Sequence, residues 1–180
     1  MKDNTGVLLY YDLANFDYTL LGISPNDLGF SQIFRAGVDI KVLDAASNNE
    51  DYSGSVVYNS NTSKLMSRMR EGAKGVLLTD YVLDKKFIQF LSQNKNFLLL
   101  PINKLISDSG FSRQRDLLFM RKLIRYLESS RVEFSIITFT DDPAHQYSRM
   151  QLLYISQLVF ANPEHAKAHV TNLKSIIGDE

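Results

Sequence analysis

The stretch SRQRDLLFMRKLIRYLESSR (residues 112–131) and the segment that follows it, VEFSIITFT (132–140), decide how the rest of the chain is interpreted. At about 100° per residue, five apolar side chains of the first segment share one arc of a helix: Leu117, Met120, Leu123, Ile124 and Leu127. Four cations share the opposite arc, with two aromatic neighbours: Arg115, Arg121, Lys122, Arg125, Phe119 and Tyr126. The second segment is a run typical of a buried parallel strand. The pattern predicts a helix with a cationic outer face, followed by a strand in the core.

Apolar runs alternate with helical patterns on both sides of this stretch. We expect strands at 7–13, 18–23, 38–43, 55–58, 75–79, 97–102 and 134–140. We expect helices at 25–35, 61–71, 83–93, 112–131 and 146–160, a short one from about 162, and a loop at 44–54. This alternation predicts an α/β fold with a mainly parallel sheet. Because a full (β/α)₈ barrel needs about 250 residues, we expect a reduced TIM-like barrel of about seven strands, lacking helices in two connections. An open doubly wound sheet is the alternative.

Composition limits the classes of protein that the chain can belong to. Its 180 residues suit one domain, 1–180, and 44% hydrophobic with 22% charged residues is ordinary for a soluble protein. The sequence contains no apolar run of membrane-spanning length and no targeting pattern at its start, so we expect a cytoplasmic protein. The absence of cysteine excludes disulfides, thiolate metal sites and a cysteine nucleophile.

Charge is unevenly distributed along a chain whose formal net charge is zero. Residues 61–131 hold fourteen basic and six acidic side chains, whereas residues 1–60 hold three and eight, and residues 132–180 hold three and six. This asymmetry favours a positive zone that faces nucleic acid or another anion, with acidic regions elsewhere.

Motifs for metal or phosphate chemistry are weak. No glycine-rich phosphate loop occurs, and His165 and His169, although four residues apart on a predicted helix, lack the remainder of an HExxH pattern. Five carboxylates follow predicted strands, where a barrel gathers its strand ends: Asp12, Asp44, Asp80, Asp141 and Asp142. They leave a magnesium site open as an alternative, although aspartates at strand ends more often cap helices or start turns.

Three blocks of the sequence together resemble the archaeal ribonuclease P protein component 3 family, a thirty-kilodalton subunit related to the polymerase-and-histidinol-phosphatase barrels. They are Tyr10–Leu13 (YYDL), Met66–Asp80 (MSRMREGAKGVLLTD), and a long block from Arg113 through the strand at 134–140 to Asn162-Pro-Glu and Ile177. The likeness covers about two-thirds of the chain. It departs from the family at 140–145, which lacks the usual basic residues, and at Ala14-Asn15-Phe16, where related phosphoesterases carry two histidines.

The resemblance implies a protein subunit of ribonuclease P, which removes the 5′ leader of precursor tRNA. The family's catalyst is the RNA, so this chain is expected to have no catalytic residue, no metal and no cofactor of its own, with Mg²⁺ bound by the holoenzyme RNA. Its partners would be the ribonuclease P RNA, precursor tRNA indirectly, and a small partner protein subunit, with no membrane.

Basic side chains would then hold RNA phosphates without reading sequence. The expected RNA-binding residues are Arg113, Arg115, Arg121, Lys122 and Arg125, supported by Lys104, Arg131 and Arg149. Phe119 or Tyr126 could stack on an unpaired base, or could pack against a neighbouring helix. Some of the basic residues could form surface ion pairs with Asp116 or Glu128 and would then not bind RNA. Two other functions stay open: a metal-dependent phosphoesterase that uses Asp12, Asp80 and Asp141, and a scaffold that binds only proteins.

Overall fold

The computed structural model describes residues 11–14, 22–81, 83–142, 146–160, 162–171, 173 and 177. Its strands are β1 (Tyr11–Ala14), β2 (Gln32–Arg35), β3 (Val42–Asp44), β4 (Val56–Tyr58), β5 (Gly75–Leu77), β6 (Phe97–Pro101) and β7 (Phe134–Ile137). Its helices are the 3₁₀ helix η2 (Pro25–Leu28) and α1 (Thr62–Arg70), α2 (Lys85–Asn94), α3 (Asn103–Ser107), α4 (Gly110–Ser130), α5 (Arg149–Val159) and α6 (Pro163–Thr171). The predicted α/β class is therefore confirmed.

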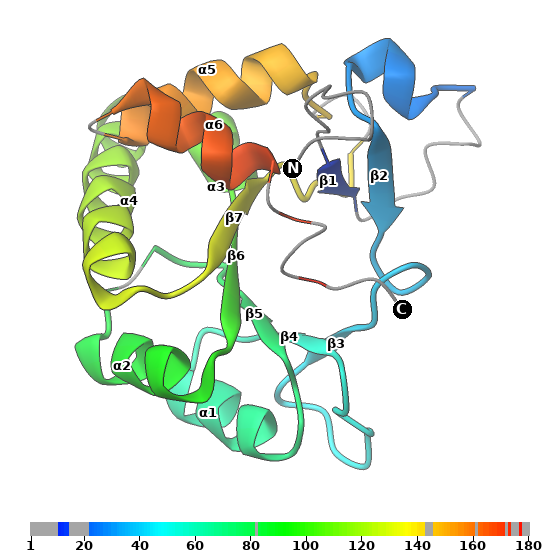
Figure 1. Cartoon of the computed structure of the whole chain (residues 1–180), viewed down its shortest axis with the longest axis vertical. Helices are drawn as coiled ribbons and strands as arrows, with labels where there is room; N and C mark the ends of the chain where they lie inside the picture. The colour runs from blue at the N-terminus through cyan, green and yellow to red at the C-terminus, as the bar shows by residue number, and fades with distance from the viewer. Residues whose placement is uncertain are drawn as a thin grey trace.

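All strand pairs are parallel. Strands β3 to β7 form one five-stranded sheet in chain order, and β1 pairs with β2. Figure 1 shows α1, α2 and α4 along the outer side of the five-stranded sheet, with β1 and β2 across the molecule from these helices. The connections at 36–41 and 45–55 contain no helix, as predicted for a reduced barrel.

Hydrogen bonds on both sides join the β1–β2 pair to the larger sheet. An isolated parallel bridge pairs Ala36, just after β2, with Ile40, just before β3. On the other side, the amide of Phe139 donates to the carbonyl of Leu13 at 3.0 Å. The strands therefore form a reduced TIM-like barrel, and these two contacts favour it over the open doubly wound sheet.

Two apolar clusters lie on opposite faces of the strands. The inner cluster takes a side chain from every strand: Leu13, Phe34, Val42, Val56, Leu77, Leu99 and Ile137. Leu173 and Ile177 pack into the same cluster. Because successive side chains of a strand alternate between its faces, Val76, Leu98 and Ile136 belong to the other, larger cluster beneath the helices. Burial on both faces explains why the strands are continuous apolar runs.

The predicted helix at 25–35 is wrong. Only η2 forms there, and it ends at Gly29, whose φ of 78° lies in the left-handed region that glycine adopts without steric cost. The rest of the segment becomes β2, in which Ile33 pairs with Asp12 and is fully buried. The apolar spacing around Ile33 fits both the helical repeat and the two-residue repeat of a strand. Pairing with β1 favours the strand.

The predicted strand at 38–43 begins too early, because β3 starts at Val42. A turn precedes β3, with φ at Gly37 of 77° and with the Asp39 carboxylate accepting the backbone amide of Arg35 at 2.7 Å. Of the predicted strand at 18–23, residues 18–21 lie outside the described residues, and Gly22 and Ile23 are not in a strand. Residues 7–10 of the first predicted strand also lie outside them.

Candidate nucleic-acid interface

Helix α4 forms as predicted and is fixed by packing on its inner face. It spans 21 residues, and Met120, Leu123, Ile124 and Leu127 are at most 1% exposed. Leu117, the fifth member of the predicted stripe, is partly buried against the same cluster. The predicted core stripe is therefore confirmed, and packing holds the opposite face of the helix toward solvent.

Lys122 and Arg125 occupy the centre of that outer face. Both side chains are exposed, and within the described part of the chain neither makes a side-chain hydrogen bond or ion pair. Arg115, two turns before Lys122, is half exposed and only 3.4 Å from its neighbour Asp116. The carboxylates nearest to this face have other partners besides Lys122 and Arg125: Glu128 contacts His165 at 2.9 Å, and Asp116 lies between Arg115 at 3.4 Å and Lys104 at 3.8 Å.

The other two predicted contacts on α4 are bound to the protein's own backbone. Arg121 donates from Nε to the carbonyl of Leu158 at 2.7 Å, which ties α4 to α5. Arg113 donates to the carbonyls of Asp108 at 2.7 Å and Ile106 at 3.0 Å, at the end of α3. Some of the donors of both arginines are therefore occupied within the fold.

The three supporting cations do not join the centre of this face. Lys104 lies on α3 and donates to the Asp80 carboxylate at 2.7 Å, a hydrogen bond that raises the pKa of the ammonium. Arg131 caps the C-terminal end of α4 with a φ of 55°. Arg149 begins α5 and lies beside Gly29.

Exposed apolar side chains on the same face were missed by the sequence analysis. Phe111 is 81% exposed and Leu118 is 56% exposed, and both lie on the outer arc with Lys122 and Arg125. Phe119 is 44% exposed, whereas Tyr126 packs partly against the core. Placing every apolar residue of the segment on the helical projection, and not only those of the core stripe, would have located Phe111 and Leu118 on the outer face.

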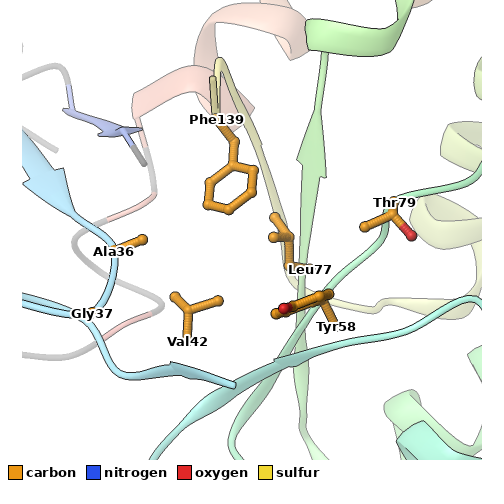
Figure 2. Close-up of a pocket in the computed structure, with 7 residues that line it drawn as sticks. All are labelled: Ala36, Gly37, Val42, Tyr58, Leu77, Thr79 and Phe139. Atoms are coloured by element: carbon orange, nitrogen blue, oxygen red, sulfur yellow. The ribbon is translucent and has the colours of Figure 1, made fainter. Parts of the chain in front are cut away.

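A pocket lies at the C-terminal mouth of the barrel, where barrel enzymes build their active sites, and the described residues that line it are neutral. The pocket, of about 310 Å³, is bounded by Ala36, Gly37, Val42, Tyr58, Leu77, Thr79 and Phe139. In Figure 2 the Phe139 ring enters this space from one side, opposite Val42 and Tyr58. Phe139 has a φ of 45°, which is unusual for a large residue. Its backbone N–H donates a hydrogen bond to the carbonyl of Leu13, which helps to hold this conformation. These described lining residues offer apolar contact and hydroxyl groups, and no carboxylate, imidazole or cation is among them.

The three carboxylates of the phosphoesterase alternative have different surroundings and different partners. Asp12 is fully buried, and its carboxylate accepts the amides of Leu13 at 2.9 Å and Thr138 at 2.8 Å and the Gln146 side chain at 2.8 Å. Burial raises its pKa despite these bonds. Asp80 is held by Lys104, and Asp141 is exposed. Among the described residues, no three His, Cys, Asp or Glu side chains are grouped so that they could hold a metal ion.

The two described histidines are bound within the fold. His165 pairs with Glu128 of α4, and His169 stacks on Phe134 with ring centroids 3.8 Å apart. His169 also donates from Nδ1 to the Phe134 carbonyl at 3.1 Å, and burial lowers its pKa. Both residues connect α6 to the barrel.

Comparison with known proteins identifies a relative of this fold. No protein-family model and no curated protein matches the sequence. Among solved structures, the chain is similar to a chain of a cryo-EM structure of archaeal ribonuclease P with mature tRNA, with a TM-score of 0.64 and 14% sequence identity. The match covers 93% of this chain and 89% of the other. No helix in the described part of the chain is long and apolar enough to span a membrane.

Proposed function

We propose that this chain is a protein subunit of ribonuclease P, which binds the catalytic RNA through the outer face of α4 and supports RNA-catalysed removal of the 5′ leader from precursor tRNA. The observation that carries the proposal is the pair Lys122 and Arg125, which are exposed and have no side-chain partner among the described residues, on a helix fixed from behind by Leu123 and Ile124. The shared fold with a ribonuclease P chain supports the same assignment.

The charges on α4 suit contact with a nucleic-acid backbone. Cations on a rigid helix can neutralise phosphates without a large loss of conformational freedom in the backbone, and they release counterions as they do so. Phe111 adds an exposed ring that can stack on an unpaired base. Such a surface positions an RNA without reading its sequence, which is the role expected of a protein that assists a catalytic RNA.

Binding of the purified chain to the ribonuclease P RNA of the same organism tests the proposal. We expect the double variant Lys122→Glu/Arg125→Glu to bind about 10- to 100-fold more weakly, with a salt dependence reduced by about one to two in logarithmic slope. In holoenzyme reconstituted at limiting RNA, the same variant should stimulate cleavage of precursor tRNA less than the unmodified chain.

The matched control is Lys85→Glu/Lys86→Glu, which makes the same charge change at two exposed positions that begin α2. It should retain most of the affinity, because α4 is the proposed contact. Equal losses in the two variants would indicate nonspecific charge attraction and contradict the assignment to α4. Full affinity of the α4 variant would overturn the proposed RNA contact.

A further inference from the structure

The outer face of α5 carries no charged side chain after its first residue. The helix reads RMQLLYISQLV, and Leu152, Ser156 and Val159 are buried on its inner face. Met150, Tyr154 and Leu158 are 44%, 61% and 53% exposed, and their spacing of four residues places them in one stripe. The neighbouring outer positions are glutamines, so this stripe lacks the charges that usually surround apolar residues on a solvated helix.

Such a face is characteristic of a protein-binding surface. Single exposed apolar residues are common and need no explanation. A contiguous exposed patch without charges is uncommon and often marks an interaction site. The centres of protein interfaces are depleted in charge and enriched in aromatic residues and methionine, which matches Met150 and Tyr154. At a rise of 1.5 Å per residue, the eight steps from Met150 to Leu158 extend over about 12 Å, or roughly two turns of a partner helix.

Charge on the adjoining helix indicates the kind of partner. Arg121 is anchored on the Leu158 carbonyl, so a guanidinium lies at the edge of the stripe. A helix seated on α5 would therefore meet apolar side chains at its centre and the Arg121 guanidinium at the border that faces α4. Its complement is an apolar stripe with aspartate or glutamate on the side that faces α4.

Other occupants fit this face less well. The centre of the stripe and the glutamines beside it offer a phosphate backbone no cation, and Arg121 at the edge already donates from Nε to the Leu158 carbonyl. A second copy of this chain, packed symmetrically on α5, would bring two sets of α4 cations to the same interface and repel them.

We infer that the outer face of α5 docks an amphipathic, acid-bordered helix of another protein subunit of ribonuclease P, separately from the RNA-binding face of α4. The choice of this partner class rests on the proposed function. The two helices would then divide the work of one subunit, with α4 facing RNA and α5 facing protein.

The test titrates each purified ribonuclease P protein subunit of the same organism into the full chain by calorimetry. We expect one subunit to bind the unmodified chain and to bind Tyr154→Glu/Leu158→Glu about 100-fold more weakly, because both introduced carboxylates would be buried in the interface. RNA binding by the isolated variant should remain within about twofold. Gln89→Glu/Gln93→Glu, two exposed positions with the same spacing on α2, is the matched control and should bind the subunit normally.

The possible outcomes separate this inference from the proposed function. Unchanged subunit binding by the α5 variant would overturn the docking surface, as would RNA binding by the chain without binding of any subunit. Loss of RNA binding in the α5 variant would assign the face to RNA instead. A dimer of the unmodified chain in sedimentation that becomes a monomer in the variant would assign it to a second copy. If neither RNA nor any subunit binds the unmodified chain, the proposed function itself fails.

Discussion

Helices α4 and α5 are neighbours with similar inner faces and different outer faces. Both bury a stripe of side chains in the same cluster against the sheet. Outward, α4 presents Arg115, Lys122 and Arg125, whereas α5 presents Met150, Tyr154 and Leu158. Packing on the barrel requires only the inner stripes, so the outer faces are free to serve binding. The contrast suggests two contact surfaces side by side on one scaffold.

The largest effect on stability should come from truncating a leucine on the inner face of α4, compared with a leucine on its outer face. Leu123 is 1% exposed within the core, whereas Leu118 is 56% exposed on the outer face. We expect Leu123→Ala to reduce the free energy of unfolding by about 3–5 kcal/mol, through lost burial and a residual cavity. Leu118→Ala should change it by less than about 0.5 kcal/mol. Urea denaturation measures both changes. Similar losses of unfolding free energy in the two variants would show that the outer face of α4 also contributes to the stability of the fold.

The second prediction concerns how the two helices are anchored. The segment before α5 is held by Gln146, which donates to the buried Asp12 carboxylate at 2.8 Å, whereas α4 is held by Arg113 at the surface. We expect Asp12→Ala to lower the free energy of unfolding by about 2–3 kcal/mol, because the amides of Leu13 and Thr138 lose a buried acceptor. Arg113→Ala should have a much smaller effect, since its site is exposed.

Asp12→Asn separates the hydrogen bonds of this site from its charge. Asparagine keeps an oxygen for the two amides, and a rotated Gln146 side chain can accept the new N–H through Oε1, which is buried without a partner. Since burial raises the pKa of Asp12, the protonated form stabilises the fold below about pH 4, and this contribution is lost as pH rises through the raised pKa. Stability of the Asn variant relative to the unmodified chain should therefore increase with pH in urea titrations. A constant difference would contradict the raised pKa.

The third prediction compares the N-termini of the helices. Ser148 forms a capping box with Gln151 at the start of α5, whereas the Ser109 side chain makes no capping hydrogen bond at the start of α4. Ser148→Ala should therefore reduce the free energy of unfolding by about 1 kcal/mol. Ser109→Ala should leave it nearly unchanged. Equal effects in denaturation experiments would show that both serines cap their helices in solution.

The sequence predicted the elements whose patterns have one interpretation. The stripe through Met120 and Leu127 could only be a core-facing helix, and the run at 134–140 could only be a buried strand, although β7 ends at Ile137. At 25–35 the pattern was ambiguous, because pairing of Ile33 with Asp12 depends on a strand twenty residues away. Local spacing carries no information about such a partner.

The candidate site was predictable as a helix face and not as a set of contacts. The sequence placed Lys122 and Arg125 on the outer arc, where the structure has them. It could not show that Arg121 would bond to Leu158 or that Lys104 would pair with Asp80, since these partners are far apart in the chain. The stripe on α5 was visible in the spacing of Met150, Tyr154 and Leu158, but its exposure follows only from which face packs.

The smallest effect concerns α6, which packs against α5 and covers β7 through His169. Because burial lowers the pKa of His169, the folded state favours the neutral imidazole. This contribution to stability is present above the ordinary pKa of about 6.5 and is lost as pH falls through the lowered value. His169→Phe keeps a ring stacked on Phe134 and removes the titrating group. The stability of the unmodified chain relative to this variant should therefore fall between pH 7.5 and mildly acidic pH, in free energies of unfolding from urea titrations. A difference that stays constant with pH would show that His169 titrates alike in the folded and unfolded chain.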